Sequence, residues 1–522
     1  MIRTSIKARV GIAIALAIVL AGGAVRGWFG AAKKTFHIDE GYSAALTNGK
    51  WVPGTDTAER DRWLDGDRLF AESFIDALAE RGASDDVAIY KATALDVHPP
   101  LYYWVFARAR ILLGVQRFAF AGYAMNMLFY VLSAALVALV AFRATRDWGS
   151  TLLALSIFVF SSTTISLTLF IRMYELLQFL CLAFLASALL VLYPAGEGRA
   201  RVASCSLGVV GLAAFAFLGL MTQYYFLFFV APVAAVCLVV LVAQRRVGPL
   251  FWAVLATVAG LYLAYRAFPE MRNHLTKSYR AKQSLKFLSK AGMTERLASL
   301  WAFARIVSAN LVPFVALVAL AVLAVVERVR KTARSAREGH ERALLAISLA
   351  VFAFTFVVIS LSAPYRTSRY LGAFFPVYGL AFVLLSRALL SDRGARVLVG
   401  AAALLVLVHG IQPKNVNEFH EDYTLDADPF YMQGETPLVI FATPEGASWK
   451  NILPYLNIGK GKRVYIAYAR IGADINDRLS AIAKSSGSSE VYALVDDYFK
   501  NKPNFDRVGY YAFYDVYRVP GE

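Results

Sequence analysis

The chain has 522 residues, of which 58% are hydrophobic and only 17% are charged. Soluble domains are about 45–50% apolar and about 25% charged, so this composition excludes a soluble globular enzyme and a disordered chain, and predicts a polytopic membrane protein. The formal net charge is +17, but Lys and Arg stand in short loops between apolar runs. No basic helix is interleaved with stacking aromatic residues, which excludes a nucleic-acid-binding protein.

Apolar runs of about the length that a bilayer requires predict about eleven membrane-spanning helices. The runs cover roughly residues 10–29, 118–142, 150–170, 172–193, 205–221, 223–243, 249–268, 301–326, 343–363, 370–390 and 395–411. The first run follows a basic start and also fits a signal peptide. We interpret it as a retained helix because many more spans follow it.

The distribution of basic residues predicts a cytoplasmic N-terminus. With that orientation, every predicted cytoplasmic loop holds at least two Arg or Lys, as the positive-inside rule requires. These residues are Arg143 and Arg146, Arg199 and Arg201, Arg245 and Arg246, then Arg328, Arg330, Lys331, Arg334 and Arg337, and finally Arg387, Arg393 and Arg396. The outer loop 269–298 breaks the rule with seven basic residues, Lys282 among them. An anionic ligand is one reason for a basic outer loop.

The tail, 412–522, changes character after its acidic opening. β-like runs at Leu438–Ala442, Val464–Ala469, Val491–Val495 and Tyr510–Arg518 alternate with helical stretches near 445–457 and 474–485. This alternation predicts a small α/β domain. The predicted architecture is a membrane domain, 1–411, with a polar outer loop over 30–98 and an interfacial helix over about 99–114, followed by an outer α/β domain, 412–522.

Asp39 and Glu40 stand directly after the first span, at the outer membrane boundary. The plain interpretation is the start of a helix, where acids are favoured in the first turn. The alternative is a catalytic base, because a partly desolvated carboxylate has a raised pKa and can accept a proton from a hydroxyl. The sequence of this segment alone leaves both open.

The outer loop ends with Asp96, His98, two prolines and an aromatic cluster that includes Tyr102. Two prolines can end one element and begin a helix, and aromatic residues suit the water–lipid interface. By itself, this segment is explained by a joint between a loop and an interfacial helix. His98 alone is more often structural than catalytic.

Further polar residues recur at predicted outer boundaries. Arg172 and Glu175 are three residues apart, so they either pair with each other or face a water-filled cavity. Tyr224 lies at the next outer boundary, and Arg366 and Arg369 lie in the last outer loop. Arg is well suited to bind phosphate through its planar, permanently charged fork.

Taken together, these segments resemble the GT-C class of membrane glycosyltransferases, and most closely the protein O-mannosyltransferase-like family and the bacterial lipid A aminoarabinose transferases. The resemblance covers about 400 residues in matching order. Its motifs are Asp39-Glu40, His98-Pro99-Pro100-Leu101-Tyr102, Arg172-Met173-Tyr174 and Arg369-Tyr370.

The resemblance implies a GT-C fold and inverting transfer of a sugar from a polyprenyl-phosphate-sugar donor to an acceptor hydroxyl on the outer face. Asp39 would be the general base, and Glu40 would orient the acceptor or Asp39. His98, Arg366, Arg369 and Lys282 would bind the donor phosphate. The supporting residues of the cavity would be Asp96, Tyr102, Arg172, Tyr174, Glu175 and Tyr224.

The chain departs from the family pattern at two positions. Phe170 stands where many relatives carry an acid, and Gln223 stands where many carry His. A second carboxylate in the cavity is therefore an open question, with Asp96 or Glu175 as candidates. Outer-face carboxylates can also bind a divalent cation, but no ligand set stands at convincing spacing, so we predict no metal ligand.

Two other classes of function stay open beside the transferase. A transporter or flippase for a lipid-linked anion would also use outer Arg and Lys, although neither internal symmetry nor broken mid-membrane helices are evident from the sequence. A non-enzymatic scaffold, the second alternative, would not explain why charged residues recur at the outer membrane boundaries. No Asn-x-Ser/Thr site occurs, which favours a bacterial inner membrane with a periplasmic site. The expected partners are membrane lipids, the lipid donor and an acceptor that is a glycan, glycolipid or protein.

Overall fold

The computed structural model describes residues 2–33, 38–49, 63–65, 85–114, 118–277, 282, 292–310, 339–363, 366–390, 392–416, 435–442, 462–469, 473–496, 499, 501–511 and 514–521. The chain forms two compact units. The helical unit comprises Met1–Ala31, Asp96–Tyr102 and Tyr123–Glu418, and the sheet unit comprises Ala32–Leu95, Tyr103–Gly122 and Phe419–Glu522. A predicted domain boundary after residue 411 stays a prediction.

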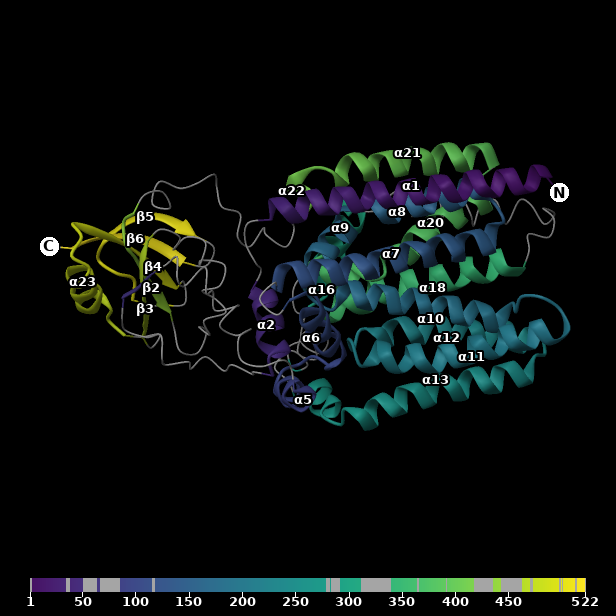
Figure 1. Cartoon of the computed structure of the whole chain (residues 1–522), viewed down its shortest axis with the longest axis horizontal. Helices are drawn as coiled ribbons and strands as arrows, with labels where there is room; N and C mark the ends of the chain where they lie inside the picture. Colours follow the sequence, from purple (N-terminus) through teal and green to yellow (C-terminus); the bar gives the residue numbers. More distant parts are fainter. Residues whose placement is uncertain are drawn as a thin grey trace. The chain divides into compact units, whose positions relative to one another are not determined.

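The helical unit is a bundle of long apolar helices (Figure 1). Its helices are α1 (Ile2–Ala32), most of α7 (Phe118–Thr145), α8 (Trp148–Phe160), α9 (Ser162–Leu169), α10 (Tyr174–Leu192), α11 (Gly198–Leu220), α12 (Phe226–Ala243), α13 (Val247–Ala267), α14 (Met271–Thr276), α16 (Met293–Asn310), α18 (Gly339–Ser362), α19 (Arg369–Gly372), α20 (Phe375–Leu389), α21 (Asp392–Gly410) and α22 (Pro413–Val416). α10 packs along α11, and α11 packs along α13.

The prediction of a polytopic helical membrane protein is confirmed. Among the described residues, eight helices are long and apolar enough to cross a membrane, and a ninth span results if α8 and α9 count together. α20 is a shorter apolar helix. The remaining predicted run, 301–326, begins in α16 and continues beyond the described residues.

Two breaks interrupt the path from α8 to α10. The axes of α8 and α9 differ by 53° at Ser161, and Phe170–Met173 separate α9 from α10. Every residue of α9 is buried. Backbone groups freed by a break at membrane depth need polar partners within the protein. Thr164 supplies one, because its hydroxyl lies 2.6 Å from the carbonyl oxygen of Phe158.

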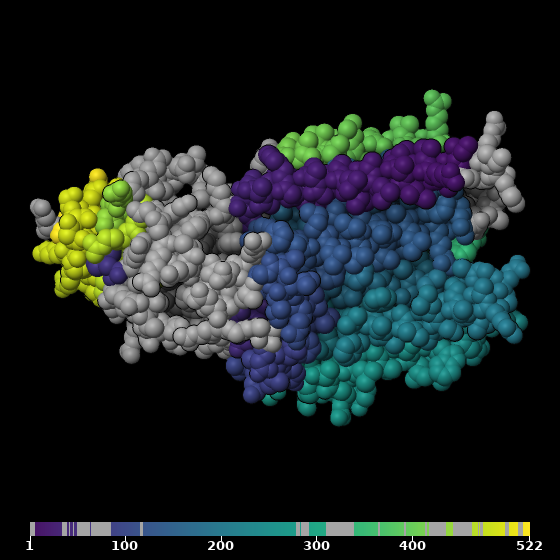
Figure 2. All heavy atoms as spheres, viewed as in Figure 1, coloured from purple at the N-terminus to yellow at the C-terminus, as the bar shows by residue number. Residues whose placement is uncertain are grey.

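α1 lies along the outside of the bundle (Figure 2), and only 11% of its most apolar 18-residue stretch is buried. Its close approach to the bundle depends on Gly22. A Cβ atom there would collide with Cγ1 of Val159 and with the hydroxyl of Tyr130. A Cβ atom at the next residue, Gly23, would have no atom of the described part of the chain within 4 Å.

We therefore expect Gly22→Leu to lower the stability of the protein by about 1–3 kcal/mol, the usual cost of overpacking. Gly23→Leu, the matched control, should leave it nearly unchanged. Thermal unfolding of the detergent-solubilised variants measures both effects. Equal unfolding temperatures for the two variants would mean that α1 does not pack through Gly22.

The sheet unit contains a six-stranded mixed sheet with strand order β1-β3-β2-β4-β6-β5. Its strands are β1 (Trp63–Asp65), β2 (Leu438–Ala442), β3 (Arg463–Tyr468), β4 (Glu490–Asp496), β5 (Asp506–Tyr511) and β6 (Tyr514–Pro520). The central strands β3, β2 and β4 are parallel, and the others pair antiparallel. β2 is a short continuous apolar run, which is typical of a strand buried on both faces.

α23 (Asn476–Ser485) packs on the sheet through Leu479, Ile482 and Ala483. Three of the four predicted strands, now β2, β3 and β4, and the helix near 474–485 are thus present. The run Tyr510–Arg518 was predicted as one strand, which is wrong, because β5 and β6 are two strands paired with each other. The predicted helix at 445–457 lies outside the described residues.

The first outer loop contributes β1, a strand that the sequence did not predict. β1 pairs antiparallel with β3. The indole of Trp63 donates to the hydroxyl of Ser485 at 2.9 Å and meets the ring of Tyr465 edge-on at 5.3 Å. The sheet therefore unites the first outer loop with the tail.

The sheet unit also holds three helices: α2 (Ile38–Thr47), α5 (Asp86–Leu95) and nearly all of α6 (Leu101–Leu113). α6 lies at the position of the predicted interfacial helix. α2 and α5 contact each other, and the Arg110 guanidinium of α6 donates to the side chain of Asn48 at 2.9 Å.

Candidate functional site

Three of the predicted site residues meet in the helical unit. His98 Nδ1 lies 2.7 Å from a carboxylate oxygen of Asp96, and His98 Nε2 lies 3.5 Å from the guanidinium of Arg172. Arg172 stands in the break between α9 and α10 and is 1% exposed. His98 therefore bridges the carboxylate of Asp96 and the guanidinium of Arg172.

This triad lies at one end of the bundle, where α9 and α11 end and α10 and α12 begin. We call it the Arg172 end; it lies opposite the N-terminus marked in Figure 1. The last turns of α1 pack here, since Phe29 joins a buried cluster with Ile165 and Leu169 of α9.

The charge of Asp96 is stabilised by its neighbours. Burial alone would raise the pKa of this carboxyl, but His98 and Arg172 outweigh burial and hold the pKa below its usual 3.8. Asp96 is therefore an ionised carboxylate at neutral pH, and its negative charge partly balances that of Arg172.

This lowered pKa predicts a loss of stability in acid. The folded state favours the ionised form of Asp96, so its contribution is complete above pH 3.8 and is lost as the pH falls through the lower folded pKa. We expect the unfolding temperature of the purified protein to fall less steeply for Asp96→Asn than for wild type between about pH 5 and about pH 2. Identical slopes would contradict this assignment.

Tyr224 pairs with a histidine that the sequence analysis missed. Its hydroxyl lies 2.7 Å from Nδ1 of His274, which is in α14 at the start of the basic loop 269–298. Burial, and then the nearby charge of Asp96, raise the pKa of Tyr224. The phenol therefore stays protonated at neutral pH and forms its hydrogen bond with His274 as a neutral group.

Arg369 opens α19, a short helix that contacts α9 and α10. Its guanidinium lies 5.4 Å from the ring centre of Tyr370, which in turn meets the ring of Tyr225 edge-on at 5.5 Å. Arg369 is 8% exposed, whereas Arg366 and Lys282 are exposed to solvent. The three predicted phosphate-binding cations are thus not equivalent, and only Arg369 is buried in the bundle.

Glu175 belongs to a different cluster from Arg172. Its carboxylate accepts hydrogen bonds from Thr168 at 3.2 Å and from Gln178 at 2.9 Å, and it interacts electrostatically with Arg26 of α1. The i, i+3 spacing that allowed a pair between Arg172 and Glu175 therefore does not produce one. Among the remaining support residues, Tyr102 is buried, and the ring of Tyr174 stacks on that of Phe170.

The predicted acid pair lies in the first turn of α2, in the sheet unit. Asp39 is 7% exposed and Glu40 is fully buried. Lys33, which the sequence analysis did not single out, places its ammonium 2.6 Å and 2.8 Å from the two carboxylate oxygens of Glu40. Burial lowers the pKa of Lys33, and the charge of Glu40 opposes that shift.

The two acids are therefore chemically distinct. Both oxygens of Glu40 accept from Lys33, so this carboxylate is neutralised by a buried partner. Asp39 precedes it at the helix start, where the helix dipole favours a negative charge.

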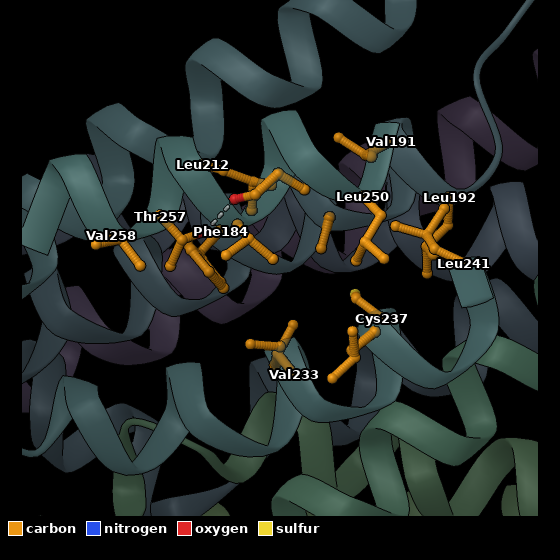
Figure 3. A pocket seen from close by; sticks show the side chains of 15 residues that line it. Phe184, Val191, Leu192, Leu212, Val233, Cys237, Leu241, Leu250, Thr257 and Val258 are labelled. Carbon is orange, nitrogen blue, oxygen red and sulfur yellow. Dashed lines mark hydrogen bonds between the residues drawn. The ribbon is translucent and has the colours of Figure 1, made fainter. Parts of the chain in front are cut away.

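The described residues contain no group of three His, Cys, Asp or Glu side chains placed to hold a metal ion. An apolar pocket lies between α10, α11, α12 and α13 (Figure 3). Its lining contains Thr257, whose hydroxyl donates to the carbonyl of Ala253, and no charged side chain. It offers no group for chemistry at a sugar or a phosphate.

No protein-family model and no curated protein matches the chain. Among solved structures, it is similar to ArnT from Cupriavidus metallidurans bound to undecaprenyl phosphate, at 13% identity and a TM-score of 0.49, with 98% of this chain and 97% of that chain covered. It is also similar to the oligosaccharyltransferase AglB from Archaeoglobus fulgidus in complex with an inhibitory peptide and a dolichol-phosphate, at 12% identity and a TM-score of 0.42, covering 92% and 69%.

A third similar structure is the arabinofuranosyltransferase AftD from Mycobacteria, at 13% identity and a TM-score of 0.35, covering 92% and 39%. Members of the GT-C class, which the sequence motifs resemble, are thus among the structures to which this chain is similar. Because these TM-scores lie below 0.5, the similarities assign no activity to the chain.

Proposed function

We propose that this multi-pass membrane protein is an inverting glycosyltransferase that moves a sugar from a polyprenyl-phosphate-sugar donor to an acceptor hydroxyl. The observation that supports this most is the triad of Asp96, His98 and Arg172 at a break between membrane helices. A buried cation at a helix break is costly in a membrane and indicates a site for an anionic group.

The donor half of the reaction needs cations. When the bond between the anomeric carbon and the phosphate oxygen breaks, its electron pair stays on the phosphate, whose negative charge grows in the transition state. Preorganised cations stabilise such a charge. In our proposal Arg172, held by His98, and Arg369 meet the phosphate. His98 then orients Arg172 rather than serving as a cation itself.

The acceptor half needs a base. The acceptor oxygen attacks the anomeric carbon from the side opposite the phosphate, which inverts that carbon, and the hydroxyl proton goes to a carboxylate. We assign this role to Asp39, because Lys33 already occupies both oxygens of Glu40. Asp39 follows the end of α1 by seven residues.

In this proposal the protein lies in a bacterial inner membrane with its N-terminus in the cytoplasm. The support is the excess of Arg and Lys in the loops opposite the Arg172 end. The Arg172 end and the sheet unit then belong to the periplasmic side. The acceptor is an envelope glycan, a glycolipid or a protein.

Mass spectrometry of envelope glycans and glycolipids tests the proposal in strains with and without this protein. We expect the deletion strain to lose a sugar-sized mass from one acceptor, and wild-type protein to restore it. A transporter or flippase can cause the same loss in cells, so the purified protein must also transfer the sugar in detergent, where no membrane separates donor from acceptor. Failure there with active donor lipid would favour the transporter.

A further inference from the structure

A buried polar cluster inside the membrane helices has no part in the chemistry above. At its centre is Arg26 of α1, which is 1% exposed. The guanidinium carbon lies 3.9 Å from the ring centre of Tyr130 in α7. Ionisable side chains at this depth are expensive and usually serve a function.

The hydrogen bonds of Arg26 converge on the first break and on α9. One terminal nitrogen donates to the carbonyl oxygen of Val159 at 2.8 Å, and Val159 is the second-to-last residue of α8. The other donates to the hydroxyl of Thr164 at 3.2 Å, and Nε donates to that of Thr168 at 3.0 Å. A single side chain of α1 thus holds both sides of the bend at Ser161.

Two further side chains hold the second break. The amide of Asn126 in α7, which is fully buried, donates to the carbonyl oxygens of Thr168 at 3.1 Å and Phe170 at 2.9 Å. These carbonyls belong to the end of α9, where the helix no longer supplies donors. From the other side of the break, Glu175 accepts from the hydroxyl of Thr168.

We propose that Arg26, Asn126 and Glu175 are positioning residues that fix α9 between its two breaks and thereby place Arg172 against His98. A buried ionic group adds little stability over well-packed apolar residues, and its best-attested use is to specify one arrangement. The arrangement specified here is a broken helix whose segment α9 ends at Leu169, three residues before Arg172. The role of Arg172 itself rests on the proposed function.

The test measures the local environment of Arg172 without reference to sugar transfer. The full-length protein in nanodiscs is treated with phenylglyoxal, and the labelling of each arginine is quantified by mass spectrometry. Arg108, with a side chain 56% exposed, is the accessible standard. Arg387, 15% exposed and bonded to Glu341 and Asp147, reports on the bundle far from α9.

We expect Asn126→Leu and Glu175→Leu to raise the labelling of Arg172 severalfold and to leave Arg387 unchanged. Arg26→Lys, which keeps the charge, should raise it less than Arg26→Met. Thr355→Val, which removes a buried hydrogen bond to Tyr378 elsewhere in the bundle, is the matched control and should change neither arginine.

Two results would overturn the inference. One is unchanged labelling of Arg172 in both Asn126→Leu and Glu175→Leu. The other is an equal rise at Arg172 and Arg387, since that would show general loosening of the bundle. If labelling of Arg172 rises as expected while sugar transfer in cells is unaffected, the positioning role stands and the proposed role of Arg172 in transfer fails.

Discussion

Replacing Asp39 with Asn is expected to reduce sugar transfer by about 10²–10⁴-fold, the usual contribution of a general base. The amide has the same shape as the carboxylate but cannot take the acceptor proton. Because Asp39 is only 7% exposed, the loss of this acid from the first turn of α2 costs up to about 2 kcal/mol, and the variant should still fold and reach the membrane. The initial rate of transfer in membranes of equal protein content measures the effect.

Asp86→Asn is the matched control for this experiment. Asp86 also lies in the first turn of a helix of the sheet unit, α5, but its side chain is 51% exposed and paired with an exposed Arg108. Exposed pairs of this kind contribute little, so transfer should be nearly unchanged. If Asp39→Asn retains the rate of the Asp86→Asn control, Asp39 is not the base.

The second large effect concerns the ion pair of Lys33 and Glu40. Their side chains are 4% and 0% exposed. Lys33→Met leaves the Glu40 carboxylate buried without this lysine, and breaking a buried pair in this way costs about 3–5 kcal/mol. We expect α2 to open locally, with a corresponding loss of transfer because Asp39 lies on the same turn.

Hydrogen exchange of the α2 peptides measures this opening directly. Protection should fall in α2 in Lys33→Met, and less so in α5. Adding Glu40→Leu removes the buried charge and should restore most of the protection, because an apolar pair can replace a buried ion pair at little cost. Wild-type protection in Lys33→Met alone would show that the pair does not hold α2.

Much of the fold could be predicted from the sequence because the membrane helices are encoded by long, continuous apolar runs. Apolar runs of about 20 residues are unambiguous, and the described helices α7, α10, α12, α13 and α18 lie within a few residues of the predicted spans, while α11 begins seven residues earlier than predicted. The strands β2 and β4 were equally clear as short apolar runs. β1 was missed because three residues carry no periodicity, and its pairing with β3 joins positions about 400 residues apart.

The site could be predicted only in part, for a similar reason. Asp96 and His98 are neighbours in sequence, but their link to Arg172 depends on the break after α9. Glu175 stands only three residues after Arg172, yet its partners are Thr168 of α9, Gln178 of α10 and Arg26 of α1. Arg26 lies inside the first predicted apolar run and was not singled out. No local pattern in the sequence reveals its hydrogen bonds to Thr164 and Thr168. The roles of Lys33 and His274 become apparent only from their contacts with Glu40 and Tyr224 in the folded protein.

The most direct measurement quantifies donor and acceptor together in a strain that lacks this protein. Lipid extracts give the polyprenyl-phosphate-sugar pool, and the envelope fraction gives the sugar on glycans, glycolipids and proteins. A transferase of this kind predicts that one polyprenyl-phosphate-sugar accumulates while the same sugar disappears from an acceptor, and that wild-type protein reverses both changes. An unchanged donor pool and an unchanged set of acceptors, in cells shown to express the protein before deletion, would contradict it.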